Sequence, residues 1–350
     1  MKATLVLDNG MRFEGTAFGC EKPAVGEVVF CTAMTGYPES LTDAAYAGQL
    51  LALTYPLVGN YGVPSHEVKE LGLEKFFESN KIQVRGLIVT DYSEEYSHWN
   101  AAETLDAWMK REGVPGITGI DTRALTKALR NEGVMGGQIV IGEAELQPQA
   151  AAYDTVNYVA EVSCEAPVTY NEGAAKKVVL IDCGVKHSLI RSLVAHDLEV
   201  VRVPYDYDFT ALNYDAVVVS AGPGNPNLYA ATVGHIAKAM ETAKPILGIG
   251  LGCQLMPTRA AFASYVYMTI FLEPCGSKRN ELFHFNFCAS RFQRCFQLFS
   301  FVFCQAFFYS LWCRFNQSFC FAQAQTCCFF YSFDNSQFVR ANFCQDNVKF

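Results

Sequence analysis

The sequence predicts an α/β protein with a mixed, β-rich N-terminal domain followed by a doubly wound domain built on a parallel sheet. Short segments of alternating polarity, separated by Gly and Asn, fill the first 150 residues. From residue 177 onward, apolar runs alternate with amphipathic helical segments. This second pattern stops at residue 256, where the composition changes. The doubly wound domain is therefore expected to be truncated there.

The N-terminal domain, residues 1–150, is expected to open with a β-meander, because Asn9-Gly10 between two alternating segments is a strong hairpin signal. Residues 122–133 have apolar side chains at helical spacing, with Asp121 as a suitable N-cap and Gly133 at the end. A further helix is expected at 101–111. Strands are expected at 3–7, 12–18, 26–32, 49–54 and 86–90.

A linker is expected at 151–176, where no long periodic segment occurs, and the second domain is expected at 177–256. Its strands are rich in Val, Ile and Leu, which is typical of parallel strands buried on both faces. Binding sites in such sheets lie beyond the carboxyl ends of the strands. The expected strands are 178–182, 198–203, 216–220 and 245–249, and the expected helices are 188–196 and 232–242.

Two Gly-rich turns, Ser220–Pro226 and Gly248–Gln254, each follow one of these apolar strands. The second has the strand, tight turn and helix start of a nucleophile elbow, in which one side chain is presented at a helix N-terminus. Unpaired N–H groups at such a terminus stabilise a thiolate or an oxyanion. Each turn taken alone is also compatible with an ordinary connection between a strand and a helix.

These turns resemble those of the class I glutamine amidotransferases, and the chain as a whole resembles the carbamoyl-phosphate synthase small-chain family. The amidotransferase motif Gly-Ile-Cys-Leu-Gly-x-Gln corresponds to Gly248–Gln254. Segments of the N-terminal half select the small-chain family, and the resemblance covers residues 1–256. These segments, with one from the second domain, are 26–30, 34–37, 41–43, 53–56, 59–62, 119–123 and 182–186.

The resemblance implies a division of labour between two chains. The small chain hydrolyses L-glutamine, and the ammonia passes to a large chain that makes carbamoyl phosphate for arginine and pyrimidine synthesis. ATP and Mg²⁺ are expected in the large chain and no cofactor in this one, which has no phosphate loop of the Gly-Lys-Ser/Thr type. The resemblance therefore implies a heterodimer, and the cytoplasm is the expected compartment because the sequence shows no secretory signal.

The resemblance also implies roles for individual residues. Hydrolysis proceeds through a thioester that needs a Cys nucleophile, a His base and a Glu that orients the His. The nucleophile position is Gly250, so the Cys is missing. The oxyanion-hole donors map to Gly224 and Leu251. The glutamine-binding positions are Ala45, Gly222, Gly224, Leu251 and Gln254, and Ala45 replaces a serine that is usual in the family.

The remaining catalytic residues are not recognisable. After Gly250 the only histidine is His284, and Asn286 stands where the acidic partner would be. Cys253 lies one helical turn beyond the elbow, which moves its sulfur several ångströms from the reacting position, so rescue by Cys253 is not expected. The sequence therefore predicts a small chain deficient in glutaminase activity. The alternatives are a non-catalytic docking subunit of an ammonia-dependent synthase and a non-functional, frameshifted product.

Residues 257–350 have a composition of their own, with 21 of the 27 Phe, 9 of the 14 Cys and one of the 26 Gly. The first 256 residues carry 31 acidic and 19 basic side chains, and the tail carries 4 and 8. We interpret the tail as the result of a frameshift, inversion or assembly error and not as a domain of the family. A membrane anchor at 296–313 is the weaker alternative, because four polar residues interrupt an 18-residue stretch.

Composition also excludes several classes of function. The net charge is −8 and the chain has no Lys/Arg block, which argues against a nucleic-acid partner. The first residues show no basic stretch leading into a long apolar run, so no secretory signal is expected. The cysteines follow no Cys/His ligand spacing, so no metal site is expected.

Overall fold

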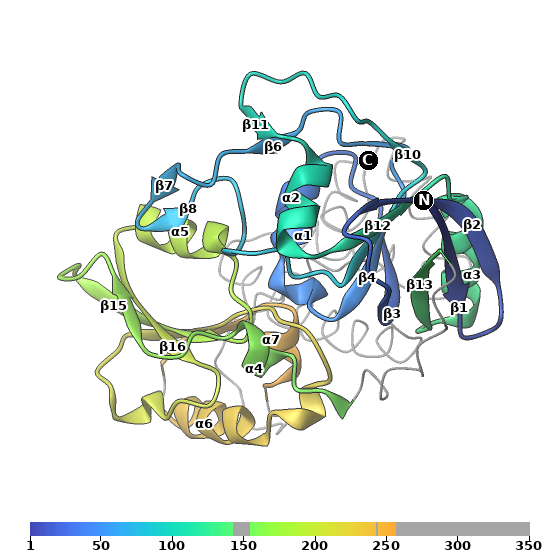
Figure 1. Ribbon diagram of the computed structural model, residues 1–350. Coiled ribbons are helices and arrows are strands. Elements are labelled where there is room, and N and C mark those ends of the chain that lie inside the picture. The colour runs from blue at the N-terminus through green and yellow to red at the C-terminus, as the bar shows by residue number, and fades with distance from the viewer. Residues whose placement is uncertain (143–154, 243, 257–350) are drawn as a thin grey trace, which may run out of the picture. The chain divides into compact units, whose positions relative to one another are not determined.

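The computed structural model describes residues 1–142, 155–242 and 244–256, all of which belong to one compact unit. Figure 1 shows two sheet-based domains within this part of the chain. The mixed α/β fold expected from the sequence is confirmed.

The N-terminal domain is a closed barrel with the strand order β1-β13-β3-β4-β9-β12-β2. β1 and β2 form the expected hairpin, and Gly10 adopts φ +85° in its turn. A closed barrel leaves no strand edge open to pairing with another chain. Its strands are β1 (Lys2–Leu7), β2 (Arg12–Gly19), β3 (Ala24–Cys31), β4 (Gln49–Leu53), β9 (Gly86–Ile88), β12 (Pro115–Thr118) and β13 (Gly136–Ile141).

The predicted β-meander is wrong beyond the first hairpin. β3 does not pair with β2, but antiparallel with β13 and parallel with β4. β13 is more than 100 residues from β3 in sequence, and it lies between β1 and β3 in the barrel. Such a pairing depends on distant residues and leaves no signal in the local pattern.

The two longest helices described in the N-terminal domain, α2 and α3, accompany the barrel strands. α3 (Thr122–Glu132) begins after Asp121, whose side chain accepts a hydrogen bond from the Ala124 N–H, and it ends at Gly133 as predicted. The other helix starts later than expected: α2 spans Leu105–Glu112 with Thr104 as its N-cap, and Ala101–Glu103 form a short strand, β11. The smaller elements are α1 (Tyr37–Thr42), η1 (Ala44–Tyr46), β5 (Leu57–Val58), β6 (Val63–Pro64), β7 (Lys69–Glu70), β8 (Leu73–Glu74) and β10 (Asp91–Tyr92).

The second domain is a five-stranded sheet with the order β14-β16-β15-β17-β18. All pairs are parallel except β14 with β16. β14 lies inside the range expected to be a linker, so the sheet takes in residues before 177. The elements of this domain are α4 (Val159–Val162), β14 (Val168–Tyr170), β15 (Lys176–Asp182), α5 (His187–Ala195), β16 (Leu198–Pro204), η3 (Phe209–Ala211), β17 (Ala216–Val219), η4 (Pro226–Leu228), α6 (Ala230–Met240), β18 (Ile246–Gly248) and α7 (Leu251–Gln254).

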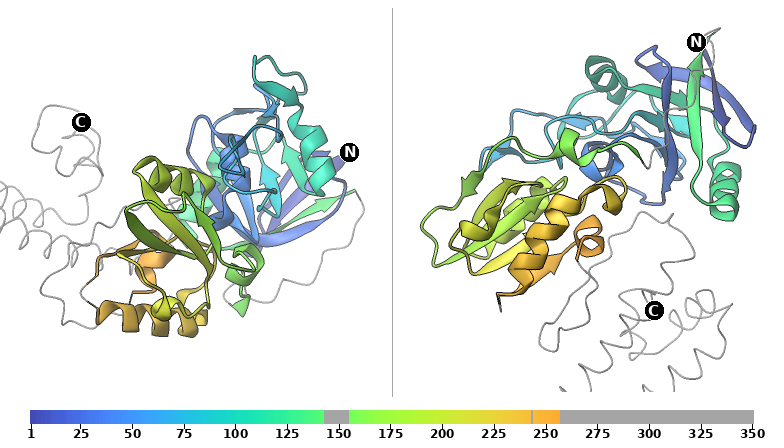
Figure 2. Two further views of the ribbon diagram at one scale, coloured as in Figure 1. Left: turned by 90° about the vertical axis from the view of Figure 1, so that its left-hand side faces the viewer. Right: turned by 90° about the horizontal axis from the view of Figure 1, so that it is seen from below.

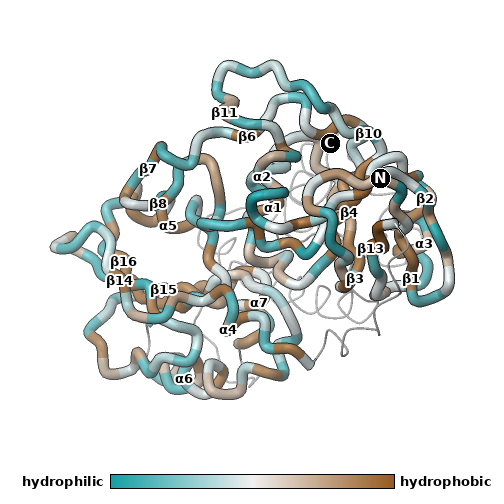
Figure 3. The backbone as a smooth tube through the Cα atoms, viewed as in Figure 1, coloured by the Kyte–Doolittle hydropathy of each residue, from teal (hydrophilic) through white to brown (hydrophobic). Residues whose placement is uncertain are grey.

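The sheet is covered on both faces, as a doubly wound fold requires. Alternate residues of β15 enter two different apolar clusters: Val178 and Leu180 pack with Ile190 of α5, while Val179 and Ile181 pack with Ile236 of α6. Figure 2 shows α5 and α6 on opposite faces of the sheet, and Figure 3 shows the hydrophobic residues running along β15 and β16. The C-terminal ends of β15, β17 and β18 consequently meet at one edge.

Candidate active site

The turn between β18 and α7 has the geometry of the predicted elbow. Gly250, the N-cap of α7, adopts φ 54° and ψ −117°, a conformation that side-chain-bearing residues rarely adopt. Helix α7 lies close to the sheet: a Cβ built on Gly252 would overlap the carbonyl oxygen of Val219, at the end of the neighbouring strand β17. A Cβ on Gly248 would lie 2.8 Å from the Cα of Cys253. Glycines on both sides of position 250 are therefore required by packing.

The second Gly-rich turn, Ser220–Pro226, lies beside this elbow. The Gly252 N–H donates to the Ser220 carbonyl at 3.1 Å, and a Cβ built on Gly250 would lie 3.2 Å from the Cβ of Ala221. A side chain at position 250 would thus start out toward Ala221. The structure brings the two predicted turns together at one sheet edge.

Hydrogen bonds to Cys183 and Tyr229 hold the backbone of the second Gly-rich turn in place. The buried Ser220 hydroxyl accepts from the Cys183 N–H at 2.9 Å and donates to the Ala221 carbonyl. The Tyr229 hydroxyl donates to the Pro223 carbonyl at 3.2 Å, and burial raises the pKa of Tyr229 to about 12. These bonds fix the backbone around Gly222 and Gly224, the predicted glutamine-binding positions.

A third turn, between β15 and α5, completes this edge. Asp182 is fully buried, accepts from the N–H groups of Gly184 and Val185 at 2.9 and 2.8 Å, and pairs with Arg202 at 2.6 Å. A buried carboxylate needs such partners, and here they define the turn. Gly184 packs against the second turn, since a Cβ built on it would lie 3.2 Å from the Cα of Gly222.

The loop that carries Ala45 reaches the same place from the barrel domain. The Ala45 N–H donates to Asp43 at 3.0 Å, and Asp43 pairs with Lys186 at 2.6 Å. A Cβ built on Gly184 would lie 3.1 Å from the Cβ of Ala44. The structure therefore brings the Ala45 loop to the turns that contain Gly222 and Gly250, although these positions are widely separated in sequence.

The remaining predicted residues are placed as follows. Leu251 is buried in the first turn of α7, whereas Gln254 is exposed at its end. Their parts in an oxyanion hole and in glutamine binding remain predictions. His284, Asn286 and the segment 296–313 lie outside the described residues.

Cys253 does not occupy the place of the missing nucleophile. Its N–H donates to the Gly250 carbonyl at 3.0 Å, and its backbone lies against Gly248. A side chain at position 250 would instead point toward Ala221. The other thiols near the site, Cys183 and Cys164, are structural: burial raises the pKa of Cys183 well above its ordinary value and that of Cys164 to about 12. Such thiols stay protonated and unreactive near neutral pH.

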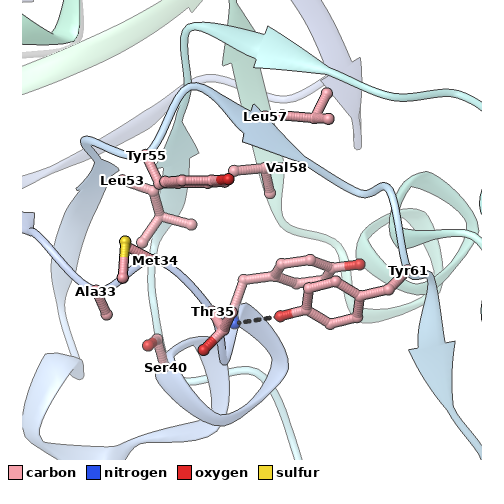
Figure 4. Close-up of a pocket in the computed structure, with 10 residues that line it drawn as sticks. Ala33, Met34, Thr35, Ser40, Leu53, Tyr55, Leu57, Val58 and Tyr61 are labelled. Carbon is pink, nitrogen blue, oxygen red and sulfur yellow. Dashed lines mark hydrogen bonds between the residues drawn. The ribbon is translucent and has the colours of Figure 1, made fainter.

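The barrel domain contains a separate cavity that the sequence did not predict (Figure 4). Tyr37 and Tyr61 stack there with ring centroids 4.2 Å apart, and the Tyr61 hydroxyl accepts from the N–H of Tyr37 at 3.0 Å. No carboxylate, imidazole or thiol lines this cavity, and its polar side chains carry only hydroxyl groups. The lining residues are Ala33, Met34, Thr35, Tyr37, Ser40, Leu53, Tyr55, Leu57, Val58 and Tyr61.

Two further properties concern only the part of the chain that the structure describes. It contains no group of three or more His, Cys, Asp or Glu side chains placed to hold a metal ion. None of its helices is both long and apolar enough to cross a membrane.

Comparison with known proteins identifies both domains. The family described as "Carbamoyl-phosphate synthase small chain, CPSase domain" matches residues 5–139, and "Glutamine amidotransferase class-I" matches residues 179–284. The second match thus runs past residue 256, where the recognisable motifs stop.

Named relatives agree with these matches. The carbamoyl phosphate synthase arginine-specific small chain of Chaetomium globosum is 47% identical over 73% of this chain and 57% of its own length. The carbamoyl phosphate synthase small chain of Pyrococcus furiosus is 44% identical over 73% of this chain and 71% of its own length. The human carbamoyl-phosphate synthase [ammonia], mitochondrial, is 42% identical over 75% of this chain and 18% of its own length.

The chain therefore spans only 57% of the Chaetomium relative and 71% of the Pyrococcus relative. The chain belongs to the carbamoyl-phosphate synthase small-chain family and carries a class I glutamine amidotransferase domain.

Proposed function

We propose that this chain is a carbamoyl-phosphate synthase small chain that binds glutamine but does not hydrolyse it. The observation that carries the proposal is Gly250 at the elbow. Thioester chemistry begins when a thiolate forms a C–S bond with the carboxamide carbon, and ammonia leaves after it receives a proton from an acid–base group. Gly250 has a hydrogen atom in place of the sulfur-bearing side chain, so the acyl-enzyme cannot form.

Glutamine binding is a separate step that needs no nucleophile. The turn containing Gly222 and Gly224 is held by hydrogen bonds of Ser220 and Tyr229, and Leu251 is buried in an apolar cluster. None of these contacts needs a side chain at position 250. Ala45 lacks the hydroxyl that is usual in the family, which removes one hydrogen bond to the ligand. We therefore expect binding that is weaker than in a chain with serine at this position.

The proposed partner is a synthase large chain, which would hold ATP and Mg²⁺ and form carbamoyl phosphate in the cytoplasm. The match of residues 5–139 to the small-chain domain supports docking through the barrel domain. This partner would have to obtain its nitrogen from free ammonia, because no glutamine-derived ammonia would reach it.

A second candidate follows from one relative. The human protein is named for ammonia and not for glutamine, and 267 of its residues align with this chain at 42% identity. A small-chain sequence can thus be part of an ammonia-named synthase. In that case this chain would be a docking subunit with no role in glutamine binding.

One assay distinguishes these functions. Carbamoyl phosphate formation is measured with the purified chain and a large chain, first with glutamine and then with ammonium chloride as the nitrogen source. We expect carbamoyl phosphate to form with ammonium chloride only. Isothermal titration calorimetry with glutamine then separates the two candidates, because a glutamine-binding small chain shows binding and a docking subunit without a glutamine site does not. Formation with glutamine that disappears in Cys253→Ala would contradict our account of the elbow. Size-exclusion chromatography tests the third possibility, a non-functional product that aggregates.

A further inference from the structure

Helix α5 begins without a cap from its own sequence. Its N-cap is Lys186, whose side chain makes no capping hydrogen bond because an ammonium group cannot accept one. The first N–H groups of a helix have no partner within the helix and must be satisfied from elsewhere. At α5 these groups belong to His187 and Ser188.

Both acceptors come from a single residue of the barrel domain, Glu78. Its carbonyl accepts from the His187 N–H at 3.0 Å, and its carboxylate accepts from the Ser188 N–H at 2.9 Å. A negative charge at this end of a helix also interacts favourably with the helix dipole. Glu78 thus serves as an N-cap although 110 residues separate it from Ser188.

Glu78 is itself fixed to the loop that carries Ala45. The Glu78 N–H donates to the hydroxyl of Thr42 at 3.0 Å, and Thr42 is fully buried. The next residue, Asp43, forms the ion pair with Lys186 at 2.6 Å. The barrel domain therefore holds the start of α5 at two adjacent points, its N-cap residue and its first turn.

Two further contacts come from the segment just before Glu78. The Glu74 carbonyl accepts from Arg191 of α5 at 2.9 Å. Leu73 is buried in the same apolar cluster as Ile190 and the strands of the second sheet. These contacts make the 73–78 segment a structural part of the amidotransferase domain.

The position of α5 matters for the site because the turn before it contacts the glutamine-binding turn. A Cβ built on Gly184 would lie 3.1 Å from the Cβ of Ala44 and 3.2 Å from the Cα of Gly222, so Gly184 packs closely against both residues. Movement of the start of α5 would move Gly184 and change the space around Gly222. Packed backbones of this kind transmit displacement because they have no room to absorb it.

We infer that Glu78 is a positioning residue of the glutamine site: by capping α5 from the barrel domain, it sets the Gly222–Gly224 turn relative to Ala45. The inference rests on the proposed binding of glutamine at that turn. It assigns to the barrel domain a role in shaping the amidotransferase site as well as the proposed role in docking.

The test compares Glu78→Ala, Glu78→Gln and the matched control Glu70→Ala in the full chain. Glu70 is an exposed carboxylate of the nearby strand β7. Hydrogen exchange is followed by mass spectrometry in peptides covering 183–190 and 219–226, without ligand, and glutamine affinity is measured by titration. For Glu78→Ala we expect about threefold to thirtyfold faster exchange in both peptides, from the usual effect of losing a cap, and weaker glutamine binding.

Glu78→Gln keeps an acceptor but loses the charge, so it should give a smaller rise in the same two peptides. It also keeps the test decisive if Glu78→Ala does not fold. If Glu78→Ala raises exchange in peptide 183–190 alone, Glu78 caps α5 only locally and the inference is overturned. The inference is also overturned if the control Glu70→Ala raises exchange in both peptides as much as Glu78→Ala does. If the unsubstituted chain binds no glutamine, the binding step of the proposed function fails, while exchange in 219–226 still decides whether Glu78 sets that turn.

Discussion

Gly250 faces Ala221 across the two Gly-rich turns, such that a Cβ on Gly250 would lie 3.2 Å from the Cβ of Ala221. The family resemblance implies a cysteine at this position, and the backbone conformation found here costs free energy for any residue with a side chain. In this chain the strained conformation persists at φ 54°, but glycine adopts it without that cost. The turn thus has the backbone shape of a nucleophile elbow, with a glycine at the position from which a side chain would be presented.

Placing a side chain at position 250 should therefore destabilise the chain. We expect Gly250→Ala to lower the free energy of unfolding by about 1–3 kcal/mol, from backbone strain and the tight contact with Ala221. Urea denaturation measures the change. The matched control is Gly234→Ala, in the middle of α6, where a Cβ would meet nothing within 4 Å. This control should stabilise the chain by roughly 0.5–1 kcal/mol, and equal effects of the two substitutions would contradict the prediction.

Substitution of either partner in the ion pair of Asp182 with Arg202 should strongly lower the free energy of unfolding, and the two effects should not add. Asp182→Ala leaves Arg202, whose side chain is only 16% exposed, without its partner, and removes the acceptor for the Gly184 and Val185 N–H groups. We expect a loss of about 3–5 kcal/mol in the free energy of unfolding.

The double variant Asp182→Ala with Arg202→Met should lose less than the sum of the two single losses, because it leaves no unpaired buried charge. Chemical denaturation of the three variants gives the coupling energy. Strict additivity would show that the two side chains do not interact in solution.

The buried His187 should make the free energy of unfolding depend on pH. Burial, assisted by the nearby Arg202, lowers the pKa of this histidine below its ordinary value of 6.5. Between the lowered folded pKa and 6.5, the unfolded chain binds more protons than the folded chain, so stability must rise with pH through this window. We expect urea midpoints to be steady above pH 7 and to fall as the pH drops below 6.5.

His187→Gln should reduce this slope, because the substituted side chain does not titrate. His196→Gln is the control, since His196 lies exposed at the other end of α5. If the slope survives unchanged in His187→Gln, some other group is responsible.

Ala45→Ser should strengthen glutamine binding. The added hydroxyl restores the hydrogen bond that the family resemblance implies, which corresponds to about threefold to tenfold in the dissociation constant. Titration calorimetry measures the change. Ala33→Ser is the control, because Ala33 lines the separate cavity of the barrel domain. A stronger effect of Ala33→Ser than of Ala45→Ser would place the ligand in that cavity instead.

The sequence predicted those parts of the structure that depend on neighbouring residues. Lys176–Asp182 and Ala216–Val219 are found as strands where 178–182 and 216–220 were predicted, because burial on both faces requires a continuous apolar run. The elbow was predicted because close packing demands glycine at positions 248 and 252. The strand order of the barrel was not, because Gly136–Ile141 pairs with strands more than 100 residues away.

The same distinction applies to the site. The positions of Gly222 and Gly250 follow from local turn signals, whereas the contacts of Glu78 with His187 and Ser188 join residues about 110 apart. A glutamate in a loop gives no indication that it caps a distant helix. The one available signal was the poor N-cap, Lys186, which implied that the helix start would need an acceptor from elsewhere.

The strand that closes the barrel, β13, is also the last of its strands in the sequence, and it ends at Ile141. Every strand of the barrel therefore precedes, in the order of translation, the first strand of the second sheet, β14. All strand pairs of the barrel can thus form without residues that are translated after codon 141, so a change of reading frame beyond that codon leaves the barrel's strand pairing intact.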